Sequence, residues 1–577
     1  MTPTDRASEP SVRLPGNWLS PMAFAIAVTL LLPLVALVVM AIARDNGTIA
    51  HLSRTVMPEL LFNTSGLVIG VAIGAAVLGT ATAWLIAMCE FPGRRILEWA
   101  LIMPLAIPAY IMAYAYTDLL SHPGLVQSSL RSITGLGPRD YWFPEVRSLG
   151  GAITMFILVL YPYVYLLART AFLEQSSCYI EVARTLGRSP YQTFRQVSLP
   201  LARPAIVAGV TLAVMETLAD FGTVAHFGVA TFTTGIYRAW LSMDDVAAAA
   251  QLSLSLLAVV MTVVLLERMS RGRARTSNSR RTRALEGYRL EGWRAVGAMA
   301  VCSLPVLFGF IFPVAVLFAM AWSDGHNLLS PRYIGLISNS VTLAGTAAVL
   351  AVGLALILAY AARLRPSPLS TAANRLANLG YAIPGSIIAI AVIVPFAALD
   401  NTIDAAMRST FSISTGLMLS GTIAALVFAY LVRFMAVALD GVEAGLARIS
   451  PSMDAAARTL GESEFGTLRR IHLPLLRSGL LAAGLMVFVD VMKELPATLI
   501  LSPFNYDTLA VQAYRLAADE RLEQAATPAV ALVAIGLIPV IIISRRIAST
   551  RSGRTVARVV EAPVPLHEFE PKPHAQA

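Results

Sequence analysis

The chain has 577 residues, of which 56% are hydrophobic and only 14% are charged, and its mean hydropathy is +0.67. Soluble globular domains carry about 25% charged residues, so the composition excludes a single soluble domain and indicates a polytopic membrane protein. Three scattered cysteines, Cys89, Cys178 and Cys302, fit neither a disulfide framework nor a metal knuckle. Among 44 basic residues only Lys493 and Lys572 are lysines, and neither follows the glycines of a phosphate-binding loop. An ATP motor of that type must therefore lie on another chain.

Twelve apolar stretches are long enough to cross a membrane as helices, which takes about 20 residues each. The first is longer than the apolar core of a signal peptide, about 7–15 residues, so we expect it to be retained as a helix. The stretches lie at roughly 22–43, 65–89, 96–120, 149–170, 204–226, 247–267, 295–322, 339–362, 376–398, 413–437, 478–502 and 525–544.

Arginines are concentrated in alternate connections between these stretches. The connections after the second, fourth, sixth, eighth, tenth and twelfth stretches are rich in Arg, and we assign Arg433 to the connection after the tenth stretch. Basic residues favour the cytoplasmic side of a membrane. We therefore expect both termini and the linker between the sixth and seventh stretches to be cytoplasmic.

The chain repeats itself with an offset of about half its length. The tripeptide Ala-Ile-Pro at 106–108 recurs at 382–384, and the pentapeptide Ala-Arg-Thr-Leu-Gly at 183–187 recurs at 457–461. Each half holds six stretches, so the two halves have the same orientation and the repeat is parallel. The predicted units are a cytoplasmic N-terminal tail (1–21), a first six-helix repeat (22–267) with a cytoplasmic loop at 171–203, an Arg-rich cytoplasmic linker (268–294), a second six-helix repeat (295–545) with a loop at 438–477, and a cytoplasmic disordered tail (546–577).

The cytoplasmic loop of the first half has the pattern of a helix, a turn and a second helix. Residues 183–186 favour a helix, and Gly187 suits the position after a helix where φ is positive. Ser189 and Pro190 suit the N-cap and first position of a new helix, and we expect Pro200 to end it. A second copy runs from 454 to 474 with a glycine at the corresponding turn, so we do not interpret the two copies as ordinary loop helices.

These two loops resemble the E-A-A-x-x-x-G-x9-I-x-L-P loop of binding-protein-dependent ABC importer permeases, where it is the coupling helix that docks into a groove on the ATPase subunit. This sequence departs from the pattern at Val182 and at Ala455, where an acidic residue precedes the expected position by one. A salt bridge made by the first acidic residue is therefore expected to be missing or shifted in the second half. The resemblance assigns ATPase coupling to Glu181, Ala183, Gly187, Val197, Leu199, Pro200, Asp454, Ala456, Ala457, Gly461, Ile471, Leu473 and Pro474.

The resemblance implies an all-α polytopic fold, with about 12 transmembrane helices arranged as two parallel six-helix repeats, as in the transmembrane domains of type I ABC importers. It implies no enzymatic activity and no cofactor on this chain, because ATP and Mg would bind to a separate ATPase subunit. The implied partners are an ATPase dimer, a periplasmic substrate-binding protein and the lipid bilayer of a bacterial inner membrane, without nucleic acid. The binding protein is expected to dock on the outer loops 121–148, 227–246, 399–412 and 503–524.

Four carboxylates lie in the fifth and eleventh stretches as repeat mates. Glu216 and Asp220 are four residues apart, as are Asp490 and Glu494, so each pair shares a helix face. A central carboxylate facing lipid costs about 2.5–3.5 kcal/mol, so these side chains should face an inter-half path, a partner helix or water. Fixed oxygens suit hard cations, and one hypothesis is that they line or gate a cation path without binding a metal tightly. The alternative is that they make helix–helix ion pairs and polar contacts near the outer surface.

The segments 220–240 and 493–510 look like the iron(III) branch of these permeases, although fused permeases for thiamine, polyamines and phosphonates share much of this pattern. A secondary cation-coupled transporter would use the same carboxylates, but the parallel repeat and the paired loops argue against it. A membrane enzyme lacks support, since the sequence has no HExxH, no G-x-S-x-G and no His cluster.

Overall fold

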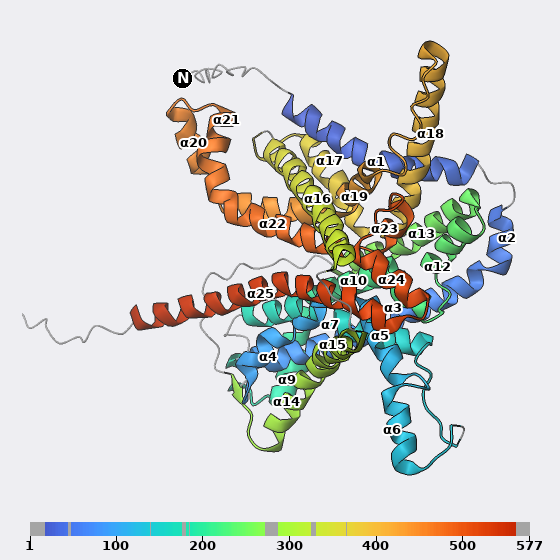
Figure 1. Ribbon diagram of the computed structural model, residues 1–577. Helices are drawn as coiled ribbons and strands as arrows, with labels where there is room; N and C mark the ends of the chain where they lie inside the picture. The colour runs from blue at the N-terminus through green and yellow to red at the C-terminus, as the bar shows by residue number, and fades with distance from the viewer. Residues whose placement is uncertain are drawn as a thin grey trace, which may run out of the picture.

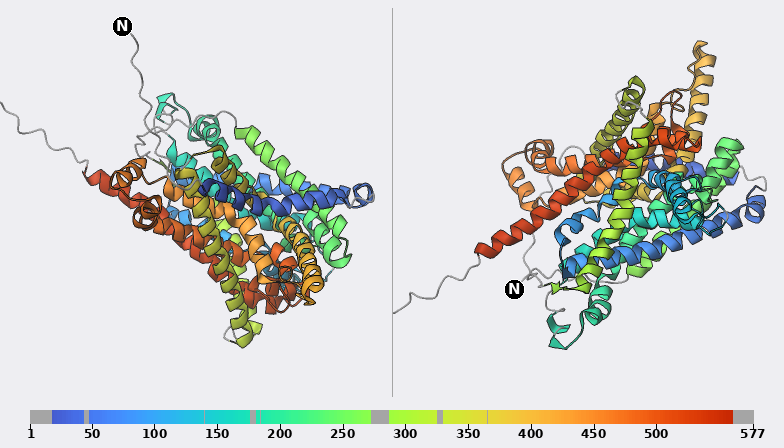
Figure 2. Two further views of the ribbon diagram at one scale, coloured as in Figure 1. Left: turned by 90° about the horizontal axis from the view of Figure 1, so that it is seen from above. Right: turned by 60° about the horizontal axis from the view of Figure 1, so that its bottom comes forward.

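The computed structural model describes residues 18–43, 48–138, 140–175, 181–183, 185–271, 287–324, 330–364 and 366–560. Nearly all of these residues are helical (Figures 1 and 2). The first half contains α1 (Leu19–Ala43), α2 (Thr48–Thr55), α3 (Met57–Met88), β1 (Cys89–Glu90), α4 (Arg94–Ala100), η1 (Met103–Ala106), α5 (Ala109–Leu120), α6 (Leu125–Thr134), α7 (Leu149–Glu174), α9 (Pro190–Thr193), η2 (Phe194–Ser198), α10 (Leu199–Ala219), α11 (Gly222–His226), α12 (Phe232–Tyr237), η3 (Arg238–Ser242) and α13 (Val246–Arg271).

The second half repeats the order of the long helices but not every short element. It contains β2 (Tyr288–Arg289), α14 (Trp293–Val306), η4 (Leu307–Ile311), α15 (Phe312–Asp324), α16 (Pro331–Leu364), α17 (Pro368–Ala377), η5 (Asn378–Ala382), α18 (Gly385–Phe411), α19 (Ile423–Leu446), α20 (Pro451–Thr459), α21 (Glu464–Thr467), η6 (Leu468–His472), α22 (Leu473–Lys493), α23 (Pro496–Leu501), α24 (Leu509–Ala518) and α25 (Leu522–Val560).

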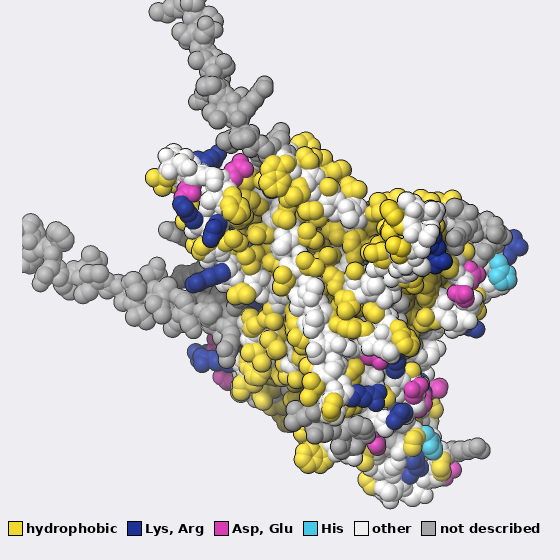
Figure 3. All heavy atoms as spheres, turned by 45° about the horizontal axis from the view of Figure 1, so that its top comes forward, with side chains coloured by type: hydrophobic (Ala, Val, Ile, Leu, Met, Phe, Trp, Pro, Cys, Tyr) yellow, Lys and Arg dark blue, Asp and Glu magenta, His cyan; other side chains and the backbone are white. Residues whose placement is uncertain are grey.

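Eleven helices among the described residues are long and apolar enough to cross a membrane, or twelve if one bent pair counts as a span. Figure 3 shows hydrophobic side chains over the middle of one face and charged side chains gathered towards its ends. Such an apolar surface suits lipid rather than water. The prediction of an all-α membrane protein with about twelve spans is confirmed.

The bent pair corrects the third predicted span. The expected helix 96–120 is interrupted, and the segments Arg94–Ala106 and Ala109–Thr134 meet at 92°. Ile107 has φ −98° and ψ 122°, outside the helical region, because a following proline disfavours the α conformation of the residue before it. The repeat mate Ile383, which precedes Pro384, has φ −94° and ψ 96°, so the expected helix 376–398 likewise starts anew at the repeated Ala-Ile-Pro motif.

The fifth and eleventh predicted spans also end earlier than expected. The helix expected at 204–226 stops at Ala219, and the helix expected at 478–502 stops at Lys493. Each is followed by a short, separate helix, α11 in the first half and α23 in the second. Both halves therefore contain two interrupted spans at equivalent places.

The halves interlock in space instead of packing as separate bundles. Helix α1 packs against α16, α17 and α18 of the second half, whereas α14 and α15 pack against α3, α4 and α5 of the first. The Tyr116 hydroxyl on α5 donates a 2.6 Å hydrogen bond to the Phe308 carbonyl oxygen in η4. The sequence repeat therefore does not correspond to two spatially separate units, which composition and periodicity did not predict.

Parts of the predicted linker and of the predicted C-terminal tail form regular secondary structure. Within the linker predicted at 268–294, α13 continues to Arg271 and β2 pairs in parallel with β1 of the first half. Helix α25 continues to Val560, so residues 546–560 of the predicted disordered tail are helical. No proline lies between Pro539 and Pro563, so no proline interrupts the helix before Val560.

The two ends of the molecule carry different elements. In Figure 1 the helices α20 and α21 and the C-terminal part of α25 lie at the left end, whereas α2, α6 and the far end of α18 lie at the right end. The predicted cytoplasmic loop of the second half and the predicted outer loops are thus at opposite ends of the spans.

Candidate functional site

A cavity of about 150 Å³ lies between the two halves, where the interrupted spans meet. Interrupted helices in membrane proteins are tolerated where the freed backbone lines a cavity or is buried in protein. The wall includes Ile107 and Pro108 at the first break and Leu495 and Pro496 at the eleventh span. The charged lining residues are Glu216, Asp220, Arg433, Asp490, Lys493 and Glu494.

Asp220 and Glu494 each close the end of a span and start the next short helix. The Thr223 amide donates to Oδ1 of Asp220 at 2.8 Å. The Ala497 amide donates to Oε1 of Glu494 at 2.8 Å, and the Thr498 amide donates to its Oε2 at 2.9 Å. Carboxylates commonly satisfy the free amides at helix N-termini. Each of these two carboxylates therefore caps the short helix that follows it in the same half.

Arg433 is the cationic partner of Glu494, and the sequence prediction misplaced it. Nη1 of Arg433 lies 2.8 Å from Oε1 of Glu494, with side chains only 12% and 1% exposed. We assigned Arg433 to a cytoplasmic connection, but it lies within α19 and lines the cavity. A charge inside a spanning helix usually faces the protein interior and has a partner, which is the signal that could have found it.

Asp490 and Glu216 lie on the same wall, one helical turn before the capping carboxylates. Lys493 from the second half reaches across the cavity wall, and its Nζ donates a 2.9 Å hydrogen bond to the Leu105 carbonyl oxygen in the first half. All four predicted carboxylates thus line one inter-half cavity. A role for them in a substrate path stays a prediction.

The two predicted coupling loops share a helix end built on glycine. Gly187 has φ +72° and Gly461 has φ +79°. The amide following each glycine bonds to a carbonyl five residues back, Arg188 N to Ala183 O and Glu462 N to Ala457 O, both at 3.0 Å. This is the left-handed helix ending in which glycine is favoured, and it is the same in both copies.

Large apolar side chains are exposed at matched positions around these glycines. Leu186 and Leu460 are 73% and 82% exposed, and Tyr191 and Phe465 are 68% and 70% exposed. Contiguous exposed apolar side chains commonly mark a surface that binds another protein. The loop motif did not include these four residues, although their 274-residue offset could have indicated them.

The remaining coupling residues lie around this surface or just behind it. Val197, Leu199, Ile471 and Leu473 are partly buried, Ala183 and Ala457 are buried, and Glu181 and Ala456 are exposed. The expectation that Pro200 ends a helix is wrong, because the chain passes through the π-helical turn η2 and Pro200 lies in the first turn of α10. Pro474 has the same place in α22, where a missing backbone N–H costs little.

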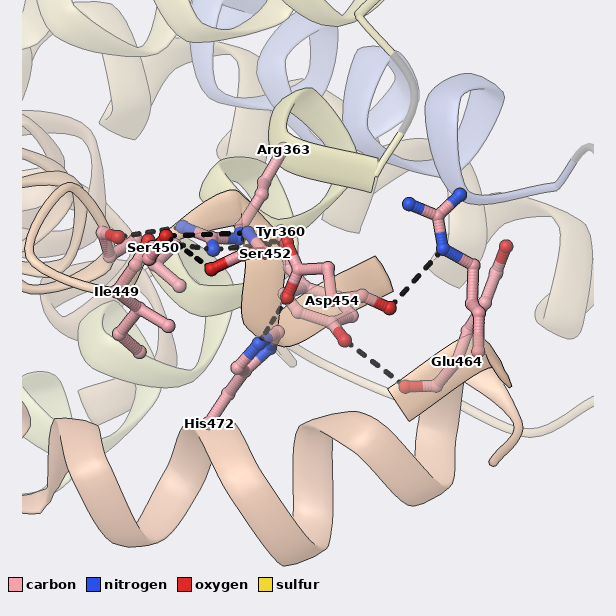
Figure 4. A network of polar contacts seen from close by, with 10 residues as sticks. Tyr360, Arg363, Ile449, Ser450, Ser452, Asp454, Glu464 and His472 are labelled. Carbon is pink, nitrogen blue, oxygen red and sulfur yellow. Dashed lines mark hydrogen bonds and ion pairs between the residues drawn. The ribbon is translucent and has the colours of Figure 1, made fainter. Parts of the chain in front are cut away.

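A polar network holds the second coupling loop to α16 (Figure 4). Asp454 Oδ2 accepts a 3.0 Å hydrogen bond from Arg363 Nε, and Asp454 Oδ1 lies 2.7 Å from His472 Nε2. Arg363 also donates to the carbonyl oxygens of Leu446 and Ile449, at 2.6 and 3.0 Å. The salt bridge expected to be missing or shifted in this half is therefore present through the acidic residue one position earlier.

The equivalent region of the first half is packed by aromatic rings. Trp84, the repeat mate of Tyr360, stacks obliquely on Phe194 at 4.9 Å between ring centroids and contacts Phe172 edge-on at 5.4 Å. Ser198 occupies the place of His472. Among the described residues the two coupling loops thus have the same helix ending but different attachments to the membrane helices.

Replacing Asp454 with Asn is expected to loosen the second coupling loop. Arg363 and Asp454 are only 15% and 18% exposed at their side chains, and weakening hydrogen bonds to a largely buried group costs about 1–3 kcal/mol. Amide hydrogen exchange should accelerate over α20 and α21 and stay unchanged over α9. Exchange that is unchanged in α20 would show that the network does not restrain this loop.

A tight metal site is not evident in the described part of the chain, which has no group of three or more His, Cys, Asp or Glu placed to hold a metal ion. Cys89 and Cys302 are buried free thiols, and Cys178 lies outside the described residues.

Comparison with known proteins gives two kinds of match. The family described as binding-protein-dependent transport system inner membrane component matches residues 75–271 and again residues 351–551. The Fe(3+)-transport system permease protein FbpB 2 of Haemophilus influenzae is 28% identical over 92% of this chain and 99% of its own. The probable ABC transporter permease protein y4fN of Sinorhizobium fredii is 25% identical over 92% of this chain and 96% of its own. The putative 2-aminoethylphosphonate transport system permease protein PhnU of Salmonella choleraesuis is 27% identical over 43% of this chain and 89% of its own.

Proposed function

Because the chain belongs to the family of binding-protein-dependent transport system inner membrane components and is a fused, two-half permease subunit of an ABC importer, we propose that it imports ferric iron delivered by a periplasmic binding protein. The observation that carries the importer function is the pair of matched loops, each with a left-handed glycine and exposed apolar residues. Similarity to an Fe(3+)-transport permease along nearly the whole chain supports iron.

The two ends of the molecule suit two partners. An ATPase dimer would dock on the coupling loops, where Leu186 and Leu460 offer apolar anchors. ATP hydrolysis would belong to that partner, which would bind on the side of the membrane to which the arginine-rich connections assign both termini. The binding protein would dock at the opposite end, on 121–148, 227–246, 399–412 and 503–524. There Arg147 and Glu520 join two outer loops from different halves by hydrogen bonds of 2.7 and 2.8 Å.

Transport then follows from alternating access. A loaded binding protein docks outside, ATP draws the two coupling loops together, and the halves open the cavity outward, with hydrolysis resetting the cycle. The loaded binding protein must bind the outward-open state more tightly than the other state, because only such a difference in affinity shifts the population towards it. The interlocked first spans couple the halves, because α1 and α14–α15 each pack on the opposite half.

A phosphonate is the second candidate substrate, favoured by the similarity of one half to 2-aminoethylphosphonate permeases. The cavity wall carries four carboxylates and two cationic side chains. When all are ionised this wall is net acidic, which favours a cation over an anionic phosphonate. Thiamine and polyamines, which are cationic, remain alternatives of the same class.

Uptake of radioactive iron into proteoliposomes tests the proposal. The vesicles would contain this chain with its ATPase and binding-protein partners, with and without ATP. ATP-dependent ferric uptake that requires both partners is expected. Stimulated ATPase activity without iron movement would refute iron, and uptake of 2-aminoethylphosphonate in the same vesicles would identify the second candidate.

A further inference from the structure

The two halves line the inter-half cavity with residues that correspond in the repeat, 274 positions apart. Asp220 corresponds to Glu494 and Val159 corresponds to Arg433, and all four line the cavity. The helices that carry Val159 and Arg433, α7 and α19, also begin 274 positions apart. The other cationic side chain of the wall, Lys493, donates to a backbone carbonyl oxygen of the first half at 2.9 Å. The wall is therefore two-fold in these carboxylates, but only the second half places an arginine beside its own.

The two carboxylates have the same capping contact and differ in their ionic partner. The amide three residues later donates to each of them at 2.8 Å, from Thr223 to Asp220 and from Ala497 to Glu494. Glu494 is also paired with Arg433, whose Nη1 lies 2.8 Å from its Oε1. Asp220 accepts a further hydrogen bond from the Thr223 hydroxyl at 3.1 Å, but it has no ion pair in the described part of the chain. A carboxylate inside a membrane protein usually has a partner, so Asp220 lacks what Glu494 has.

The packing around the two carboxylates explains why a guanidinium fits only in the second half. A Cβ at Gly385 would collide with the guanidinium of Arg433 and would lie 2.5 Å from Oε1 of Glu494, so this ion pair needs a glycine beside it. The residue that follows the Ala-Ile-Pro motif in the first half is Ala109, and it lines the cavity. The space beside Asp220 therefore suits a cation that is smaller than a guanidinium.

A buried hydroxyl without a partner lies on the same part of the wall. Tyr110 lines the cavity and is 4% exposed, and its hydroxyl has no hydrogen-bond partner among the described residues. It packs against Gly222, two residues after Asp220, where a Cβ would lie 2.8 Å from the Cβ of Tyr110. Buried polar groups are normally satisfied, and an exception calls for a water, an ion or a ligand. Oxygen atoms are the ligands that hard cations prefer, so the first half offers a carboxylate and a phenol to such an ion.

We propose that the transported cation binds at Asp220, where the first half lacks the arginine of the second, with the Tyr110 hydroxyl as a further oxygen ligand. Arg433 neutralises the corresponding Glu494, so the cavity offers one cation site instead of two. The first half thus carries the site, and the second half supplies a closed ion pair opposite it. This inference rests on the proposed function in taking the cargo to be a cation, and it adds where the cation binds.

The direct test measures terbium(III) binding to the purified full-length chain in detergent by equilibrium dialysis. Terbium is a trivalent, oxygen-preferring probe, and this measurement needs neither the ATPase nor the binding protein. Asp220→Asn should weaken the binding of one terbium ion per chain by roughly tenfold or more. Loss of the carboxylate charge is the reason, and equal binding by the wild type and Asp220→Asn would overturn the proposal.

Two tyrosines of α5 provide a matched comparison. Tyr110→Phe should weaken terbium binding by about fivefold, the effect of losing one hydrogen-bonding group. It should leave the unfolding midpoint unchanged, because the hydroxyl has no partner to lose. Tyr114→Phe removes another buried hydroxyl without a partner, from a residue that does not line the cavity, and should leave terbium binding unchanged. Equal affinities in the two variants would contradict a ligand role for Tyr110.

The converse variant copies the second half into the first. Ala109→Gly combined with Val159→Arg reproduces the arrangement of Gly385 and Arg433, so the new guanidinium should pair with Asp220 and abolish terbium binding. Ala109→Gly alone adds no charge and should bind far more terbium than the double variant. A double variant that elutes and unfolds like the wild type and still binds terbium would overturn the proposal. If it does not fold, the comparison of the two tyrosine variants decides.

Iron uptake in proteoliposomes separates this inference from the proposed function. Normal ATP-dependent iron uptake by Asp220→Asn would overturn the site and leave the proposed cargo standing. The expected terbium results, together with no iron uptake by the wild type, would refute the proposed cargo and leave the cation site standing.

Discussion

Replacing Arg433 with Met is expected to destabilise the protein by about 3–5 kcal/mol, the range for breaking a buried ion pair by removing one partner. The Glu494 side chain is 1% exposed and would lose its only ion-pair partner among the described residues. Its hydrogen bonds to Ala497 and Thr498 would remain, so the cost arises from the uncompensated charge. The unfolding midpoint in detergent, measured by circular dichroism, reports the loss.

Two variants show whether the charge is the reason. Arg433→Met combined with Glu494→Gln should recover a large part of the stability, because the buried charge is gone. Arg147→Met removes a comparable arginine from an exposed pair, with side chains 40% and 62% exposed, and should cost less than about 1 kcal/mol. Equal losses in Arg433→Met and Arg147→Met would contradict this account of the cavity wall.

The spans and the coupling loops could be predicted because their signals are local. Apolar stretches of about 20 residues identify membrane helices, and the repeated loop carries its own turn residue. Gly187 and Gly461 were expected to have positive φ, and they do. The interruptions were harder, since stretches such as 96–120 are apolar throughout. Only Pro104 and Pro108 mark the break, and prolines inside α7 and α18 leave those helices continuous.

The cavity wall depends on distant parts of the chain, which no single stretch encodes. The four carboxylates could be expected to face inward because lipid would penalise them. Arg433 escaped prediction because it lies near the end of an apolar stretch, where a short shift places it inside or outside the membrane. The hydrogen bond from Lys493 Nζ to the Leu105 carbonyl oxygen joins residues 388 positions apart. The packing of α1 on the second half could not be predicted either. In a membrane the lipid is as apolar as the helices, so hydrophobicity does not determine which helices pack together.

Valine in place of Gly187 or Gly461 is expected to uncouple ATP hydrolysis from transport. Both glycines have left-handed φ values, +72° and +79°, and an L-residue there costs about 1–2 kcal/mol, with a β-branched residue worse. A free-energy cost of that size lowers the population of the native, left-handed helix ending by about 5–30-fold. The exposed Leu186 or Leu460, one residue earlier, would then leave its position on the docking surface. The membrane helices should remain folded.

Asparagine provides the matched control, because it tolerates the left-handed conformation better than other non-glycine residues. A Cβ at either glycine would meet no atom within 4 Å, so the size of the side chain is not limiting and backbone conformation alone separates the two variants. Iron moved per ATP hydrolysed should therefore fall strongly in Gly187→Val and little in Gly187→Asn. The same comparison at Gly461 measures the share of each half, since only the second loop is held by Asp454 and Arg363. If valine and asparagine lower coupling equally, the loop needs a bare backbone for contact with the ATPase and its left-handed turn is not the cause.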